Sequence, residues 1–163
     1  IDKVYLYDGT LEGLFTIVFD TYVQHSIPNN IIAQATYSYN LLEETKQIQT
    51  DYEKSSRIFH GIMQNISQEA LYWSYTAFQS SSSYKEMAIL KYILRGFQVG
   101  SKINTMLSLD EVLQVYQLQR NVLREAHRLK GLVHLAEIDN NLFYSSIHPD
   151  NNVITWAAEN RAH

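Results

Sequence analysis

The sequence predicts an α+β fold that is predominantly helical, with about five helices packed with a small antiparallel sheet. Six Gly and two Pro make only 8 of 163 residues, below the usual ~12%, and so few chain breakers favour helices. Apolar residues recur at helical spacing in several segments. After residue 131 the apolar period changes to two, which indicates strands. A length near ~150 residues suits one domain, so we expect a single domain over 1–163, truncated at its C-terminus.

The first 49 residues are expected to hold one strand and one helix. Residues 4–7 are β-prone and end at an Asp-Gly turn signal. A helical apolar period runs from Leu11 to Tyr22, with Thr10 as its N-cap. Residues 31–49 show no clean period, so irregular structure with some extended segments is expected there.

Capping boxes predict where three later helices begin. In each box a Ser or Thr side chain bonds the backbone three residues on, and a Glu at that position bonds back. Ser67 is expected to cap a further helix. The longest helix is predicted to run to Lys130, with Gly131 as a left-handed cap. The three boxes are Thr50/Glu53, Ser83/Glu86 and Ser108/Glu111.

A β-hairpin is expected after this helix. Residues 132–138 and 142–147 alternate on either side of an Asp-Asn-Asn turn. In that register His134 would oppose Ser146 and lie one diagonal step from His148. Together with the strand at residues 4–7, the hairpin would form the antiparallel sheet.

The composition excludes several classes of site. The chain has no Cys, which excludes disulfides, thiolate metal sites and Fe–S ligation. No apolar run approaches the ~18–20 residues that span a bilayer, so we expect a cytoplasmic protein with no membrane partner. The charged residues give 13 − 17 = −4, so any nucleic-acid site must be a local basic patch.

One such patch lies on the longest predicted helix. At 100° per residue, Arg120, Arg124 and Arg128 fall on the side opposite a core stripe centred on Val122, and Lys130 follows them. Arginines in this arrangement can pair with phosphates. The alternative is a solvated helix face with cations near its C-terminus.

Histidines form a second candidate site. His127 at the end of the helix, His134 and His148 on the hairpin, and Asp150 just after it could carry out acid–base catalysis. Structural or exposed histidines are the alternative. No metal-binding spacing is present, and we expect neither a metal nor a cofactor.

The junction of helix and hairpin resembles a known pattern. Glu-Ala-His-Arg-Leu-Lys-Gly at 125–131, followed by Leu-Val-His-Leu, resembles a motif of a bacterial family labelled as DNA metabolism or DNA repair proteins. Further blocks at residues 7–14, 50–58, 95–100 and 149–153 match that family in the same order. Its members accompany a radical-SAM protein, and related domains are fused to uracil-DNA-glycosylase-like proteins.

The resemblance implies an accessory protein of DNA metabolism that works with a radical-SAM partner, with DNA as a further partner. Two alternatives stay open: an enzyme acting on a nucleic-acid base or backbone through the His/Asp site, and a protein-interaction scaffold. The chain departs from the pattern at Leu132, His134, Leu135, His148 and Asn151. The positions that match are Glu125, His127, Arg128, Gly131, Asp150 and Asn152.

Overall fold

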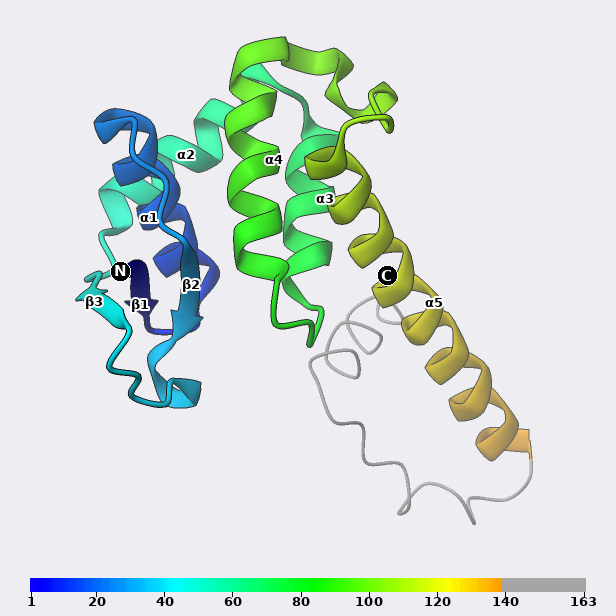
Figure 1. Ribbon diagram of the computed structural model, residues 1–163. Coiled ribbons are helices and arrows are strands. Elements are labelled where there is room, and N and C mark those ends of the chain that lie inside the picture. Colours follow the sequence, from blue (N-terminus) through cyan, green and yellow to red (C-terminus); the bar gives the residue numbers. More distant parts are fainter. Residues whose placement is uncertain (139–163) are drawn as a thin grey trace.

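The computed structural model describes residues 1–138, which form three strands, five α-helices and two short 3₁₀ segments (Figure 1). The N-terminal part alternates strand and helix, and the rest of the described chain is helical. The elements are β1 (Asp2–Tyr7), α1 (Leu11–Gln24), β2 (Asn30–Ala33), η1 (Gln34–Thr36), β3 (Glu43–Gln47), α2 (Tyr52–Asn65), α3 (Gln68–Phe78), α4 (Lys85–Val99), η2 (Gly100–Thr105) and α5 (Asp110–Ile138).

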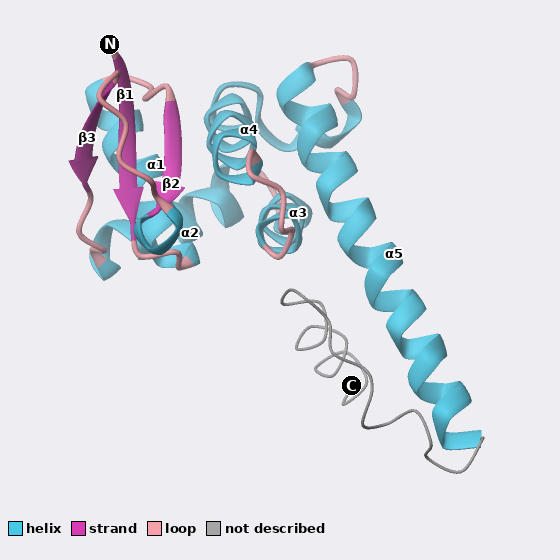
Figure 2. Cartoon of the chain, turned by 60° about the horizontal axis from the view of Figure 1, so that its bottom comes forward, coloured by secondary structure: helices cyan, strands magenta, loops and turns pink. Residues whose placement is uncertain are grey.

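The sheet is parallel, so the predicted antiparallel sheet is wrong. Its strand order is β2-β1-β3, and both outer strands run parallel to β1 (Figure 2). Helix α1 carries the chain back to the end of the sheet where β1 began, which is the crossover that parallel pairing requires. Both outer strands come from residues 30–47, where the sequence shows no clean period. Their side chains are mostly half-buried or exposed, so no alternating apolar pattern marks them.

The predicted C-terminal hairpin is also wrong, because residues 132–138 form the last two turns of α5. Gly131 has no positive φ and lies inside the helix instead of capping it. Extending an existing helix needs no new nucleation step. An alternating apolar pattern of only seven residues is too short to end the helix in favour of a strand. The second predicted strand, 142–147, lies outside the described residues.

Side-chain caps explain where the first helices begin. The Thr10 hydroxyl accepts a hydrogen bond from the Gly13 N–H at 3.0 Å, and Ser67 accepts one from Ala70 at 2.9 Å. Both caps confirm the predictions. Helix α2 is capped by Asp51 instead of Thr50, and the Asp51 carboxylate accepts hydrogen bonds from the two backbone N–H groups at residues 53 and 54.

The other two capping boxes do not mark the residues at which their helices begin. Helix α4 begins at Lys85 without a side-chain cap, and α5 begins at Asp110. The acidic residue of the box at Ser83 is Glu86, and its carboxylate turns into the interior to meet Tyr7. A tertiary contact has therefore replaced the local one.

One core joins the sheet to the helices. Helix α5 packs against α3 and α4, and α1 packs against α2 and α4. Val112, Val115 and Leu118 of α5 belong to this core, so the first turns of α5 are anchored in the body. Its largest fully buried side chains include Tyr7, Phe15, Ile31, Ile62, Tyr92, Ile93 and Ile103. None of the described helices combines the length and apolar character needed to cross a membrane.

Candidate functional site

Helix α5 has a buried side and a basic side. Arg120, Arg124 and Arg128 are exposed and follow one another at intervals of one turn, spanning about 12 Å of the helix axis. We call these three residues the basic face. The opposite side is the apolar stripe that the 3.6-residue period predicts, and it consists of Val115, Leu118, Val122, Ala126 and Leu129, all buried.

An acidic side chain lies beside the basic face. Glu125 Oε1 is 3.8 Å from Arg128 Nη2, and the two side chains are 48% and 69% exposed. An ion pair this open contributes little to stability because water screens it. Lys130 is only half-buried and lies nearer the apolar side of α5.

Two members of the predicted histidine site, His127 and His134, lie among the described residues, and the structure does not bring these two together. His127 and His134 are both exposed on α5, and their seven-residue separation puts them about 10.5 Å apart along the axis. His134 therefore does not lie on a hairpin strand. Between residues 1 and 138, no group of three or more His, Asp or Glu could hold a metal ion. His148, Asp150 and Asn152 lie outside the described residues.

A cluster that the sequence analysis missed lies at the carboxyl end of β1. The Asp8 carboxylate accepts hydrogen bonds from the Thr10 N–H at 3.0 Å, the Thr10 hydroxyl at 2.6 Å and the Thr50 hydroxyl at 2.7 Å. It thereby ties the start of α1 to the segment between β3 and α2. Open parallel sheets usually bind ligands at the carboxyl ends of their strands, next to the point where successive strands are added on opposite sides. In this sheet that point is β1, which has β2 on one side and β3 on the other. In this structure Thr10 and Thr50 supply the hydrogen-bond donors of the Asp8 carboxylate.

The charge of Asp8 is favoured by this cluster. Partial burial raises the pKa of Asp8, but the hydrogen bonds from Thr10 and Thr50 outweigh burial and hold the pKa below its usual value. A carboxyl whose pKa is lower in the folded protein stabilises it above the unfolded pKa of ~4, and this contribution disappears as the pH falls.

We expect Asp8→Ala to lower the free energy of unfolding by about 1–2 kcal/mol at pH 7, because all three hydrogen bonds from Thr10 and Thr50 are lost. The difference from wild type should shrink as the pH falls below about 4. Urea titrations followed by circular dichroism at several pH values measure both effects. Asp2→Ala removes a carboxylate from an exposed site at the start of β1 and serves as the control. A pH-independent difference would contradict the assignment.

Two polar contacts, one buried and one partly buried, hold α4 against β1 and η2. The Tyr7 hydroxyl donates to Glu86 Oε2 at 2.7 Å, and the Tyr92 hydroxyl donates to Asn104 Oδ1. Burial raises the pKa of both tyrosines, so both remain hydrogen-bond donors at neutral pH. Tyr7 and Glu86 are 79 residues apart in the chain, and a contact this distant leaves no local signal. The sequence therefore did not indicate Glu86 as buried.

Comparison with known proteins finds a similarity for the second half of the chain. Searches of curated proteins and of solved structures gave no match. Residues 83–162 match the family model described as "Domain of unknown function (DUF4130)". The matched stretch contains α4, α5 and the basic face, so this part of the molecule is similar to the DUF4130 domain.

Proposed function

We propose that the protein is an accessory factor of DNA metabolism that contacts the phosphate backbone of DNA through the basic face of α5. The observation that carries the proposal is three exposed arginines one turn apart on a helix whose other side is buried. The buried side fixes the helix to the body, so the arginines are presented on a rigid element.

Arginine is well suited to this contact because its planar guanidinium binds phosphate with two parallel hydrogen bonds. A span of about 12 Å can follow two or three phosphates of one strand, because successive phosphates lie roughly 6–7 Å apart along an extended strand. Phosphate contacts position a protein without reading bases. Binding should therefore show little sequence preference.

The number of contacts sets the expected salt dependence. Three neutralised phosphates give a slope of log K against log salt near −2 to −3. Glu125 does not prevent binding, since its long and exposed ion pair with Arg128 can be exchanged for a phosphate at small cost.

The test is a fluorescence-anisotropy titration of the full chain with labelled single-stranded and duplex DNA at several salt concentrations. Changing Arg120, Arg124 and Arg128 together to Ala should weaken binding by about tenfold or more at low salt and flatten the salt slope. The fold should remain, because none of the three contributes to the buried stripe, and a melting curve checks this.

A matched variant separates the basic face from overall charge. Changing Lys3, Lys46 and Lys102, all exposed and outside α5, to Ala removes the same charge and should leave most binding intact. Equal binding by the arginine variant and wild type would overturn the proposal, as would an equal loss in both variants. No binding by wild type at low salt would favour the scaffold alternative.

The proposal of a radical-SAM partner is supported by the resemblance of the sequence blocks described above. Copurification of the full chain with a radical-SAM protein of the kind that accompanies this family tests it directly. A stable complex supports an accessory role, and its absence in the presence of DNA would contradict that part of the proposal.

A further inference from the structure

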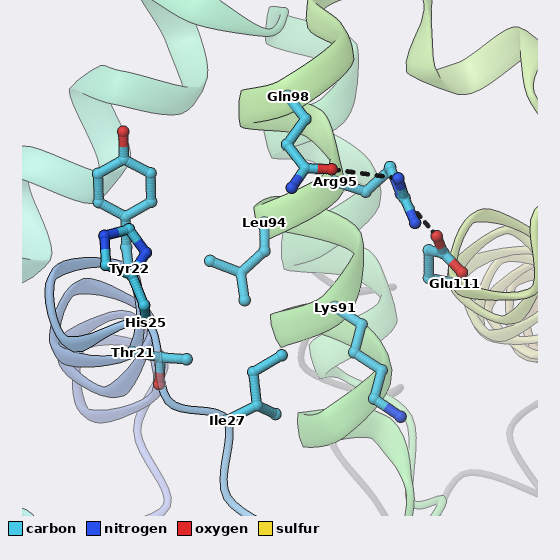
Figure 3. A pocket seen from close by; sticks show the side chains of 9 residues that line it. All are labelled: Thr21, Tyr22, His25, Ile27, Lys91, Leu94, Arg95, Gln98 and Glu111. Carbon is cyan, nitrogen blue, oxygen red and sulfur yellow. Dashed lines mark hydrogen bonds and ion pairs between the residues drawn. The ribbon is translucent and has the colours of Figure 1, made fainter.

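A groove crosses α4. It is distinct from the basic face, because Arg120, Arg124 and Arg128 do not line it. It runs from the end of α1 and the loop after it, over one face of α4, to the start of α5 (Figure 3). Its volume is about 460 Å³, within the range of ~300–1,000 Å³ typical of small-molecule sites. Segments distant in sequence thus contribute to one hollow.

The part of the groove next to α1 is apolar. Tyr22 and Ile27 line it from the α1 side, and each is 52% exposed. Leu94 points from α4 toward α1 (Figure 3). His25 ends α1 with a φ of 53°, a left-handed conformation that is rare outside glycine, and this turn brings Ile27 back against the groove. An aromatic ring beside two aliphatic side chains is a surface on which a planar ligand can lie.

The part of the groove next to α5 is charged. Arg95 Nε donates to Glu111 Oε1 at 2.7 Å, and its Nη1 donates to Gln98 Oε1 at 3.1 Å (Figure 3). The backbone N–H of Glu111 lowers the pKa of that carboxyl, and Arg95 and Lys91 lower it further. Two cations against one carboxylate leave an excess of one positive charge. Glu111 holds the Arg95 guanidinium in a fixed position, and Lys91, one turn away on α4, supplies the unbalanced charge.

A buried hydroxyl in the wall of the groove has no hydrogen-bond partner among residues 1–138. Thr21 is 2% exposed and lines the groove, and its Oγ1 makes no hydrogen bond to the part of the chain that the structure describes. Buried polar atoms are rarely left unsatisfied, and each exception calls for an explanation. Threonine uses two side-chain rotamers in helices, so this hydroxyl can turn to a ligand lying in the groove.

We propose that the groove over α4 binds a small organic anion in which a planar ring is joined to a phosphate, the chemistry of a nucleoside monophosphate. The ring lies against Tyr22, Ile27 and Leu94, where it also reaches the Thr21 hydroxyl. The phosphate lies at Lys91 and Arg95. This site is separate from the basic face and does not depend on the DNA-binding proposal.

The experiment is a calorimetric titration of the full chain with the common nucleoside 5′-monophosphates, with the parent nucleosides and inorganic phosphate as separate arms. At least one monophosphate should bind more tightly than either of its parts. Equal binding of nucleoside and monophosphate would overturn the role of the cations. No binding of any monophosphate at millimolar concentration would overturn the site.

Two variants test the residues. Lys91→Ala should raise Kd by about tenfold or more, since a charge-assisted contact is lost, whereas Lys46→Ala on β3 should not change it. Thr21→Val should raise Kd by about threefold to tenfold. In the absence of ligand it should leave the melting temperature unchanged or higher, because an unpaired buried hydroxyl is replaced by a methyl group of similar shape.

Opposite effects of Thr21→Val on ligand binding and on thermal stability are the signature of a ligand-directed hydroxyl. A parallel loss of both would mean that Thr21 is only structural and would overturn its role. The arginine variant of the basic face should bind the monophosphate like wild type. Loss of binding there would show that the phosphate binds on α5 and not in the groove.

Discussion

Replacing Gly13 by alanine is expected to lower the free energy of unfolding by about 2 kcal/mol, although alanine is the better helix former by ~1 kcal/mol. An added Cβ would lie 2.5 Å from Asp8 Oδ1, 3.0 Å from the Tyr7 ring and 3.1 Å from the Thr50 hydroxyl. It would therefore push apart the cluster that joins β1, α1 and the start of α2. Urea unfolding followed by far-ultraviolet circular dichroism measures the change.

Gly131 supplies the matched control. It also lies inside a helix, but apart from its own helix backbone no atom of the described residues comes within 4 Å of the position of an added Cβ. Gly131→Ala should therefore raise stability by up to ~1 kcal/mol, the difference in helix propensity. The two substitutions are chemically identical and should act in opposite directions. If Gly13→Ala were also stabilising, the close packing of this cluster would be disproved.

Replacing Tyr7 by phenylalanine is expected to cost about 2 kcal/mol, because the carboxylate of Glu86 would stay buried and lose its donor. Glu86 is 7% exposed and Tyr7 is 2% exposed, so water cannot readily take the place of the hydroxyl. Chemical unfolding at pH 7 gives the difference.

A double-mutant cycle with Glu86→Gln tests the origin of this cost. The amide carbonyl that this substitution introduces can still accept from Tyr7, but a neutral acceptor makes a weaker bond. Tyr7→Phe should then cost only about 1 kcal/mol when it is made in the Glu86→Gln variant. Equal costs in both backgrounds would show that Tyr7 stabilises through packing alone.

The Tyr7 hydroxyl should also affect how the free energy of unfolding depends on pH in alkaline solution. Burial and the charge of Glu86 raise the pKa of Tyr7 above its unfolded value of ~10. The stabilising contribution is therefore complete below pH ~10 and declines as the pH rises beyond it. Tyr7→Phe should reduce the slope of that decline, and the buried Tyr92 should account for part of what remains.

The sequence predicted correctly those features that depend on residues close together in the chain. The caps at Thr10 and Ser67 confirm their predictions because both bonds close within three residues. The direction of the sheet could not be predicted in the same way, because β2 and β3 carry no alternating pattern. The hairpin prediction failed since helix α5 continues through Gly131, which a glycine signal alone does not exclude.

The candidate sites also differ in whether they depend on local or on distant residues. The 3.6-residue period is enough to set Arg120, Arg124 and Arg128 opposite the buried stripe. The Asp8 cluster joins residues 42 apart in the chain, and the groove over α4 draws on α1, α4 and α5. Only tertiary packing creates them, so no pattern in the sequence could indicate either one.

The Tyr7–Glu86 contact bears on where this polypeptide can be divided. Glu86 falls inside the stretch 83–162 that resembles the DUF4130 domain, whereas its donor lies in β1. Lys85 likewise donates to the Phe78 carbonyl at the end of α3, and Ile66 packs where Gly96 leaves room. A recombinant fragment starting at residue 83 would separate each of these pairs and expose the apolar sides of α4 and α5. The limit drawn by sequence similarity therefore runs through the core and is unsuitable as an expression boundary.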